Sequence, residues 1–532
     1  MEGKEKARHM SEEDPGLSLL EKGQQGLAHM VFSRIGIIVL LLLFQLFLVF
    51  AAFYRLNAYL PHFVIFTTVF SAFLGLYLLN TDADPSAKIT WLLVILLMPA
   101  VGAPLYCYTR SNLGMRMLKK RLNYLVETTE NSIPQNRDVL NRLRKENPGA
   151  AALAHYLHRT GCYPVYDHTE VKYYPLGEDK WADLLEALQQ AEHFIFLEYF
   201  IIDEGLMWGR VLEILAEKAK AGVDVRVMYD GTCEFSTLPH DYPKRLQALG
   251  IRCKMFAPMT PFVSTHYNYR DHRKIAVIDG HTAFTGGVNL ADEYINRRPR
   301  FGHWKDTAIR LRGEAVPSFT LMFLQMWGVD EKELVIDRFL AYPTQAPAEA
   351  RGYVLPYGDC PLDNDKVGER VYMDILNRAE RYVYIMSPYL ILDGEMETAL
   401  KFAAERGVDV RLVLPGIPDK KMPWALAKTH YSTLLASGVK IYEYSPGFVH
   451  AKVFVADDKE AVVGTINLDY RSLYHHFECA AFLYDTPCIP DIRADVEATM
   501  ARSALVEKDF MEHEKPGVKL MGFLMKAIAP LL

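Results

Sequence analysis

Three long apolar runs stand near the N-terminus, at residues 35–53, 61–79 and 89–108. Each is close to the roughly 20 residues that a helix needs to cross the hydrocarbon core of a bilayer. Buried core helices are the alternative, but three such runs in succession, joined by short polar links, favour membrane spans. A cleaved signal peptide fits poorly, because further apolar runs follow and no small-residue cleavage site is clear. The pattern predicts a transmembrane region over residues 35–108, after a polar tail over residues 1–34.

Basic residues near the ends of these runs predict which side of the membrane the rest of the chain occupies. A basic cluster follows the third run, whereas the link before that run has only Lys88 and the preceding link only Arg55. Lys and Arg are enriched on the cytoplasmic side, so we expect the soluble part to face the cytoplasm. Three spans would place the N-terminus outside, but the tail also carries Lys and Arg, and its side stays open. The cluster comprises Arg110, Arg116, Lys119, Lys120 and Arg121.

Two further segments mix apolar and basic positions. In the segment 109–150, Leu118, Leu122 and Leu125 recur at helical spacing with basic residues between them. This pattern suits an interfacial amphipathic helix and, equally, an ordinary docked helix. The stretch 506–532 ends in a similar apolar sequence with two lysines, which either touches lipid or packs on the body. We expect an amphipathic linker in the first segment and an amphipathic tail in the second.

From residue 151 onward, short apolar strands alternate with amphipathic helices. An apolar strand at 194–202 is followed by a helix at 207–221, and the same succession returns at 382–391 and 395–406. Both helices lead through the sequence Gly-Val-Asp-Val-Arg into a further strand. Such alternation predicts layered α/β domains. The repeated order indicates an internal duplication.

The duplication also predicts the domain boundaries. We place the first α/β domain at residues 151–345 and the second at residues 346–505. A stretch over 342–353 that is rich in Pro and Ala is the expected link between them.

Composition narrows the range of functions. The chain has 532 residues, half of them hydrophobic, with a formal net charge of −6 and a sequence pI near 6.3. It therefore lacks the basic footprint of a nucleic-acid-binding protein. Seven cysteines are scattered without a C-x-x-C pair, so neither a disulfide framework nor a zinc site is expected.

One short motif occurs twice, once in each predicted domain. Both copies read H-x-K-x4-D, run through an apolar strand and are followed by a glycine turn that contains an Asn. Each copy alone is a weak signal, but the matched pair with matched flanks is a strong one. The first copy comprises His272, Lys274, Asp279 and Asn289, and the second comprises His450, Lys452, Asp457 and Asn467.

These residue types suit the transfer of a phosphoryl group from a phosphodiester. Lys274 and Lys452 supply positive charge for the non-bridging oxygens of the phosphate. Asn289 and Asn467 can donate amide hydrogen bonds to the same oxygens. One histidine can attack phosphorus and form a phosphohistidine, while the other protonates the leaving alcohol and then deprotonates the incoming one. No metal or other cofactor is expected, because this chemistry requires none and no carboxylate cluster suited to a metal is apparent.

Carboxylates have two different expected roles. A nucleophilic imidazole needs an acceptor behind it to fix its tautomer, and Asp306 is the candidate in the first half and Glu478 in the second. Asp279 and Asp457 are grouped with the catalytic motif, but each lies where a strand gives way to a turn, and turn support is favoured over direct catalysis. Other histidines are expected to be structural: His155, His168, His193, His240, His281, His430, His475 and His476.

The doubled motif with its glycine–asparagine turns resembles the phospholipase D superfamily. Segments 438–452 and 464–473 look like the bacterial cardiolipin synthases of that superfamily. The resemblance extends over nearly the whole chain from about residue 60. The third apolar run is similar to that family's N-terminal anchor at Lys88, Trp91, Pro99, Gly102 and Tyr106.

The resemblance implies a fold and a reaction. The fold would be α/β, with two similar phospholipase D-type halves, each a mixed sheet flanked by helices, packed around one pseudo-twofold active site and preceded by transmembrane helices. The reaction would join two phosphatidylglycerol molecules into cardiolipin and glycerol through a phosphatidyl-histidine intermediate. His272 corresponds to the family's nucleophile and His450 to its general acid and base. The phosphate-binding residues correspond to Lys274, Lys452, Asn289 and Asn467, and the imidazole-orienting acids to Asp306 and Glu478.

The resemblance also implies partners and a location. The enzyme would be a multi-pass protein of the bacterial cell (inner) membrane with its catalytic domains in the cytoplasm. Its partners would be phospholipids and the bilayer, with no nucleic acid, and assembly into a homo-oligomer stays open. The sequence departs from the family at Gly287, where many members have Ser, and in the extra apolar run 35–53.

Three other functions remain to be weighed against a membrane phosphatidyltransferase. A hydrolytic phospholipase D shares the motif, and the difference lies in how well the site excludes water. A nuclease of the same superfamily is disfavoured by the acidic charge and the apolar runs. A catalytically inactive lipid-binding scaffold is disfavoured because His and Lys are intact in both copies. The second phospholipid substrate stays open.

Overall fold

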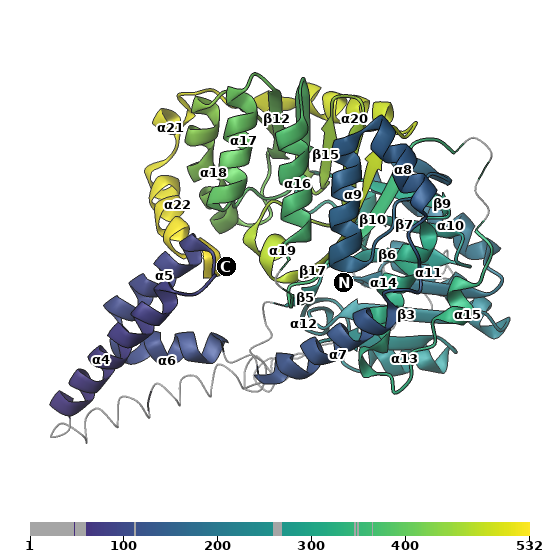
Figure 1. Ribbon diagram of the computed structural model, residues 1–532, viewed down its shortest axis with the longest axis horizontal. Helices are drawn as coiled ribbons and strands as arrows, with labels where there is room; N and C mark the ends of the chain where they lie inside the picture. Colours follow the sequence, from purple (N-terminus) through teal and green to yellow (C-terminus); the bar gives the residue numbers. More distant parts are fainter. Residues whose placement is uncertain are drawn as a thin grey trace, which may run out of the picture. The chain divides into compact units, whose positions relative to one another are not determined.

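A computed structural model describes residue 47 and residues 60–110, 113–258, 269–344, 347, 350–363 and 365–531 of the chain (Figure 1). The predicted polar tail and, apart from Phe47, the predicted span at 35–53 lie outside the described residues. By its contacts, the described chain divides into two units. One contains residues 60–110 and 113–117 with 527–531, and the other contains residues 118–258 and 269–526, with the gaps given above.

Within the described residues, the N-terminal unit contains the helices α4 (Leu60–Leu79), α5 (Pro85–Leu97) and α6 (Pro99–Arg110), with the short η5 (Ala529–Leu531) beside α5. Asp84 caps α5 by accepting a hydrogen bond from the N–H of Ala87 at 2.8 Å. The rings of Trp91 and Tyr106 meet edge to face in the small core of this unit.

The predicted span at 89–108 is not one continuous helix. It is divided between α5 and α6 at Met98, where Pro99 cannot donate the hydrogen bond that would continue α5. The two helices pack closely at Gly102, where a Cβ atom would lie 2.5 Å from the carbonyl oxygen of Val94. Among the residues that the structure describes, no helix combines the length and apolar character required to cross a membrane.

Helix α7 (Leu113–Thr129) leads into the larger unit. Leu122 and Leu125 are buried, and the guanidinium of Arg121 donates to the carbonyl oxygens of Gly328 and Glu331 at 3.2 and 2.6 Å. Such contacts are typical of an ordinary docked helix, which was the alternative to an interfacial membrane helix for this segment.

Two helices that precede the first sheet belong to the core of the second half. Buried residues of α8 (Arg137–Glu146) and α9 (Pro148–Gly161) join the hydrophobic cluster that contains the second sheet. The first sheet begins with β1 at Thr169, whereas buried residues of α9, which lie inside the predicted first domain, pack with the second sheet.

The first half is a mixed sheet of seven strands in the order β1-β9-β7-β6-β2-β3-β4. Strands β2, β3 and β4 run parallel, and the other neighbours are antiparallel. The strands are β1 (Thr169–Tyr174), β2 (Phe194–Tyr199), β3 (Asp224–Asp230), β4 (Arg252–Phe256), β6 (Lys274–Ile278), β7 (Thr282–Gly286) and β9 (Ala308–Gly313). The helical segments are α10 (Gly177–Gln190), α11 (Leu206–Lys220), α12 (Cys233–Ser236), α13 (Tyr242–Ala248), η3 (Asp292–Ile295), α14 (Val316–Trp327), η4 (Gly328–Asp330) and α15 (Asp337–Leu340).

The second half repeats this arrangement, with strands in the order β10-β17-β16-β15-β11-β12-β13-β18. Again three successive strands, β11, β12 and β13, run parallel within an otherwise antiparallel sheet. The strands are β10 (Tyr353–Asp359), β11 (Tyr382–Met386), β12 (Asp409–Pro415), β13 (Lys440–Tyr444), β15 (Val453–Ala456), β16 (Glu460–Gly464), β17 (His476–Tyr484) and β18 (Ser503–Leu505). The helices are α16 (Val367–Arg378), α17 (Gly394–Glu405), α18 (Lys421–Ala436), α19 (Tyr470–Tyr474), α20 (Ile489–Ala501), α21 (Phe510–His513) and α22 (Pro516–Ile528).

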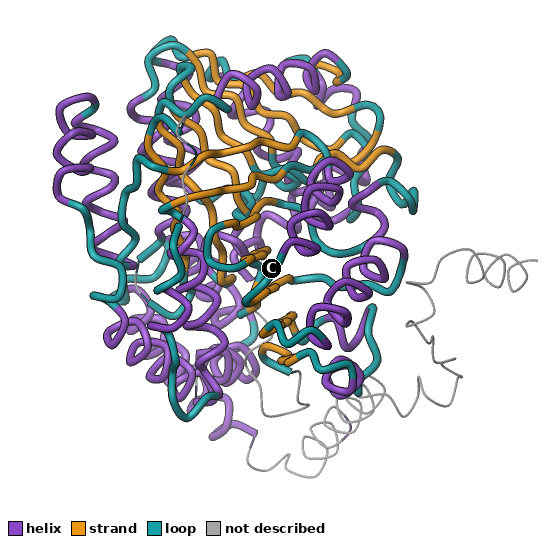
Figure 2. The backbone as a smooth tube through the Cα atoms, turned by 90° about the vertical axis from the view of Figure 1, so that its right-hand side faces the viewer, coloured by secondary structure: helices purple, strands orange, loops and turns teal. Residues whose placement is uncertain are grey.

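The matching strand order confirms the predicted α/β fold and its duplication. Helices α16, α17 and α18 lie side by side over the second sheet in Figure 1, and Figure 2 shows the orange strands running between purple helices. Helix α14 is buried along most of its length and contacts strands of both sheets.

Two short strand pairs join the halves. β8 (His303–Lys305) of the first half pairs in parallel with β14 (Gly447–Val449) of the second. β5 (Arg270–Asp271) of the first half pairs in parallel with the start of β17. Each pair ends directly before residues of the repeated motif, so the interface between the halves positions the candidate chemistry.

Candidate active site

The two motif histidines lie at the ends of the strand pairs that join the halves. His272 follows β5, and its Nδ1 lies 2.9 Å from both carboxylate oxygens of Glu478. His450 follows β14, and its Nδ1 lies 2.6 Å from Oδ2 of Asp306. All four residues are buried.

Each carboxylate therefore comes from the half opposite to its histidine. The expectation that Asp306 serves the first motif and Glu478 the second is wrong. The strand pairs explain the exchange: β5 runs beside the start of β17, which carries Glu478, and β14 runs beside β8, which precedes Asp306. Both histidine–carboxylate pairs require residues from both halves.

Burial keeps both imidazoles neutral. It lowers the pKa of His272 well below its ordinary value, and the charge of Lys274 lowers it further. Burial and the charge of Lys452 lower the pKa of His450 to about 4, against the opposing influence of Asp306. A neutral imidazole that donates from Nδ1 to a carboxylate keeps the lone pair of Nε2 for attack or proton transfer.

The two lysines concentrate positive charge in the same site. Lys274 and Lys452 are each 1% exposed, and each ammonium group donates to the main-chain carbonyl of the histidine two residues before it. Burial lowers the pKa of Lys274 to about 8 and that of Lys452 to about 7, where the charge of Lys274 contributes. A phosphate placed here would offset the mutual repulsion of the ammonium groups.

The two asparagines follow β7 and β16 and are both buried. Asn289 is held by two hydrogen bonds: its Oδ1 accepts from the N–H of Ile201 at 3.0 Å, and its Nδ2 donates to the hydroxyl of Tyr294 at 2.8 Å. Asn467 donates to Asp469, while its Oδ1 has no hydrogen-bond partner within the described chain. One amide hydrogen on each Nδ2 is left for a ligand.

The third member of each motif lies at a turn. Asp279 accepts hydrogen bonds from three successive backbone N–H groups at 2.7–2.8 Å, and Asp457 accepts from three at 2.7–2.9 Å. Both residues have positive φ, 51° and 55°. Each carboxylate thereby holds the end of one strand against the start of its neighbour. This geometry fits turn support rather than the catalytic role under which both were grouped.

The departure at Gly287 has a steric reason. A Cβ atom on Gly287 would lie 2.0 Å from Oδ1 of Asp306 and 2.9 Å from the carbonyl oxygen of His450. Thr465 occupies the corresponding place in the other half, and its hydroxyl donates to Oε2 of Glu478. The absence of a side chain at Gly287 therefore makes room for the carboxylate of Asp306.

Residues two positions before each carboxylate also reach the site, and sequence reasoning missed them. His476, expected to be structural, has its Nδ1 3.5 Å from Oε1 of Glu478 and its ring centroid 5.2 Å from that of His272. Trp304 lies at the corresponding place, with its ring centroid 5.4 Å from that of His450. The sequence could have indicated these residues, because side chains alternate between the two faces of a strand. A residue two positions before each carboxylate therefore lies on the same face as the carboxylate.

The surroundings of the two histidines differ. Trp304, Tyr294 and Phe448 surround His450 with ring centroids 5.4–5.9 Å away. His272 instead contacts Phe200, at 4.9 Å, and the polar His476. The site is therefore symmetric in its reacting groups and asymmetric in its walls.

A metal is a poor occupant of this site. His272, His476 and Glu478 do place ligand-type atoms within 4.8 Å of one another. The buried ammonium groups of Lys274 and Lys452 would, however, repel a cation, whereas they attract an anion. Two neutral imidazoles, two cations and two amides together suit a phosphodiester.

Comparisons with known proteins agree with this chemistry. Residues 184–299 and 372–500 match the family described as "Cardiolipin synthase, PLD-like domain", and residues 65–107 match "Phospholipase_D-nuclease N-terminal". A cardiolipin synthase of Alkalihalophilus pseudofirmus is 32% identical over 494 residues, 91% of this chain and 98% of that protein. The chain belongs to the cardiolipin synthase family of the phospholipase D superfamily. This membership confirms the resemblance and makes the chain an enzyme of the phosphatidyltransferase class.

Other relatives extend the picture. A cardiolipin synthase of a Geobacillus species is 34% identical over 453 residues, 85% of this chain and 90% of that protein. A protein of Streptococcus mutans described as uncharacterized is 57% identical over 459 residues, 86% of this chain and 99% of its own length.

A solved structure supports the fold. The crystal structure of a phosphatidylserine synthase from Haemophilus influenzae matches with a TM-score of 0.55 and 14% identity, covering 72% of this chain and 98% of that one. This similarity supports the fold of two α/β halves.

Proposed function

We propose that this chain transfers the phosphatidyl group of one phosphatidylglycerol to a headgroup hydroxyl of a second, giving cardiolipin and glycerol. The observation that carries the proposal is the crossed pairing of two neutral histidines with two buried carboxylates beside two buried lysines. Such a site provides one nucleophile and one acid–base group for a single phosphate.

In the first half-reaction, Nε2 of His272 attacks phosphorus. The new P–N bond forms as the P–O bond to the glycerol headgroup breaks, and His450 gives its proton to the departing oxygen. The bound phosphodiester is an anion, so it raises the pKa of the nearby His450 imidazole and favours the protonated form that this step needs.

In the second half-reaction, the headgroup hydroxyl of another phosphatidylglycerol enters. His450 takes its proton, the oxygen attacks phosphorus, and the P–N bond breaks to regenerate His272. Lys274 and Lys452 balance the charge of the phosphate in both steps, while the amides of Asn289 and Asn467 donate to its oxygens. The assignment of the nucleophile to His272 rests on the correspondence with the family.

We also propose that the N-terminal unit holds the enzyme at the bacterial cell membrane, with the catalytic halves on the cytoplasmic side. The unit exposes large apolar side chains on α4 and α5, a surface suited to lipid. They include Ile65, Phe66, Val69, Phe73, Leu96 and Leu97. Its match to an N-terminal family domain and the basic cluster after it support this placement.

A product assay tests the function. In mixed micelles, phosphatidylglycerol labelled in its headgroup and acyl chains should yield cardiolipin and free glycerol. His272→Ala should abolish both products, and the exposed His155→Ala should leave them unchanged. Phosphatidic acid as the main product would instead identify a hydrolase. Acid-labile acyl label on the protein, lost in His272→Ala, would test the nucleophile.

A further inference from the structure

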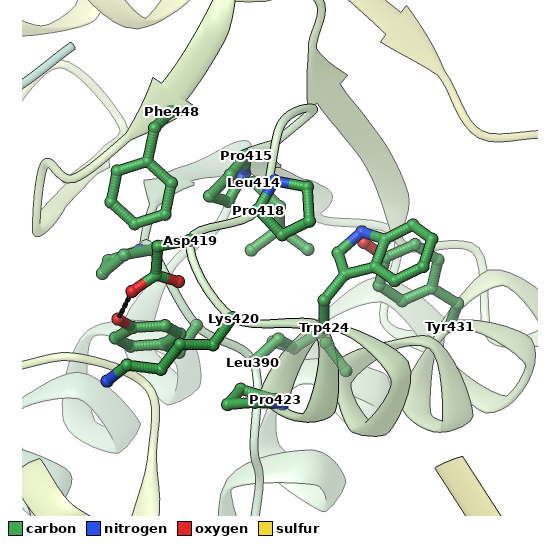
Figure 3. A pocket seen from close by; sticks show the side chains of 13 residues that line it. Leu390, Leu414, Pro415, Pro418, Asp419, Lys420, Pro423, Trp424, Tyr431 and Phe448 are labelled. Carbon is green, nitrogen blue, oxygen red and sulfur yellow. Dashed lines mark hydrogen bonds between the residues drawn. The ribbon is translucent and has the colours of Figure 1, made fainter. Parts of the chain in front are cut away.

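We propose that an apolar hollow beside His450 binds the second phospholipid, the acceptor, with its phosphate against Lys420. The inference rests on the proposed function and names the place where the acceptor enters. The hollow lies where β11 and β12 end and α18 begins, and its lining includes Leu390, Leu414, Pro418 and Trp424 (Figure 3).

The hollow and the catalytic site share a wall. Phe448 lines the hollow, and its ring centroid lies 5.9 Å from that of His450. Trp304 packs against both, with centroids 4.9 Å from Phe448 and 5.4 Å from His450. A molecule in the hollow would therefore contact Phe448, whose ring packs against the imidazole that deprotonates the acceptor in the proposed reaction.

The corresponding wall beside His272 has a different chemistry. There, Arg270 pairs with His476 across the β5–β17 ladder, in the places that Phe448 and Trp304 occupy across the β14–β8 ladder. One side of the site is thus aromatic and the other is polar. Such asymmetry is expected if the two substrates enter from different sides.

Lys420 provides a cation for the acceptor's phosphate. Its side chain is exposed, it lines the hollow, and its Nζ lies 5.8 Å from the ring centroid of Tyr389, another lining residue. In the described chain Lys420 forms no ion pair. In phosphatidylglycerol only a three-carbon glycerol separates the reacting hydroxyl from the phosphate, so a second phosphate must lie near the first.

The carboxylate of Asp419 also lines the hollow, next to Lys420 in sequence. Asp419 accepts a hydrogen bond from the hydroxyl of Tyr389 at 2.7 Å (Figure 3). It would repel a phosphate placed against it, but it can accept a hydrogen bond from the remaining headgroup hydroxyl. A glycerol headgroup, which has such a hydroxyl, therefore fits this part of the hollow.

The wall formed by Trp424 is held in place. The Nζ of Lys428 lies 4.2 Å from the centroid of the Trp424 ring and 2.5 Å from a carboxylate oxygen of Glu514. This cation–π contact restrains the indole. The Trp424 face of the hollow is thus an apolar wall held in place by neighbouring side chains, against which the acceptor would pack.

Exposed apolar side chains also occur beside the lining residues in sequence and on α22. Ile417 and Met422, close to its lining residues in sequence, are 41% and 50% exposed. Helix α22 packs on α18, since a Cβ on Gly522 would lie 2.5 Å from the carbonyl oxygen of Ala425, and it exposes Phe523. These surfaces offer the acyl chains a route to lipid.

A partition experiment tests the acceptor site. The enzyme is given acyl-labelled phosphatidylglycerol micelles with butanol, a soluble acceptor that needs no lipid subsite, and cardiolipin and phosphatidylbutanol are measured together. Lys420→Met and Trp424→Ala should each lower cardiolipin formation by about tenfold, because each removes one contact to the acceptor. Both should leave phosphatidylbutanol formation within about twofold of the wild type.

Controls separate the possible failures. Lys421→Met, the neighbouring exposed lysine outside the hollow, should leave both products unchanged, and Lys420→Arg should restore cardiolipin. If both products fall equally in Lys420→Met and Trp424→Ala, or if neither falls, the acceptor site is refuted while the proposed function stands. A wild-type enzyme that makes phosphatidylbutanol but no cardiolipin overturns the proposed function as well.

Discussion

At the scale of single residues, both motif histidines meet a carboxylate through Nδ1, but the two acids differ in length and surroundings. Glu478 is the longer acid, and the Thr465 hydroxyl donates to it. Asp306 is the shorter acid, and its Oδ1 lies where a side chain on Gly287 would have to be. Each acid thus fits the residue that directly follows the glycine of the neighbouring turn. Glu478 accepts a hydrogen bond from Thr465, and Asp306 occupies the space that the absent side chain of Gly287 leaves.

Gly287→Ser should lower kcat by about 10- to 100-fold, the usual cost of displacing a group that orients a reactive imidazole. The new Cβ would collide with Asp306 and push it away from His450. Steady-state rates of cardiolipin formation, with thermal unfolding measured beside them, check this. Gly394→Ser is the matched control, because nothing lies within 4 Å of a Cβ built there. Full activity of Gly287→Ser would contradict the steric account.

At the scale of elements, the motif aspartates tie strands together. Asp279 joins the end of β6 to the start of β2, and Asp457 joins β15 to β11, each through three backbone N–H groups. We therefore expect the aspartate to serve the motif by fixing the strand that carries the lysine, and to contribute to catalysis only indirectly.

Asp279→Ala should destabilise the folded state by about 2 kcal/mol, since it removes three charge-assisted hydrogen bonds and leaves the buried N–H of Phe194 unpaired. The fraction that stays folded should keep most of its kcat. Thermal unfolding and active-site-normalised rates distinguish this from His272→Ala, which should lose activity and keep its stability. Asp485→Ala controls for the positive φ alone, because Asp485 has φ 52° and is exposed. A large loss of kcat without a loss of stability would assign Asp279 to catalysis.

Elements also show where reading the sequence succeeds. Alternating strands and helices, and the repeated Gly-Val-Asp-Val-Arg, are local patterns, and they predicted both halves. The run 89–108 was misjudged as one helix because its apolar character hid the break at Pro99. The strands β5, β8 and β14 have only two or three residues and carry no periodic pattern.

At the scale of the two halves together, the short strands β5, β8 and β14 determine which site residues contact one another. The sequence singled out the histidines, lysines and both carboxylates as candidates by type and spacing. It could not pair them correctly, because the partner of His272 lies 206 residues away and is set by the β5–β17 ladder. The same ladder brings His476 to the site, which explains why a histidine outside the motif was missed.

Crossed pairing also predicts how inactive variants behave together. Each chain contains both histidines and both carboxylates, so one folded chain should hold one complete site. Equimolar His272→Ala and His450→Ala, mixed or co-expressed, should then show no more cardiolipin formation than either variant alone.

The alternative is that the halves pair between two chains, as in a domain-swapped dimer. A mixed dimer would then unite the intact His450 half of one variant with the intact His272 half of the other, and about a quarter of wild-type activity would return. Co-expression matters, because swapping would have to occur as the chains fold. Recovery of activity would therefore show that the strand pairs β5–β17 and β8–β14 form between chains, and its absence would place them within one.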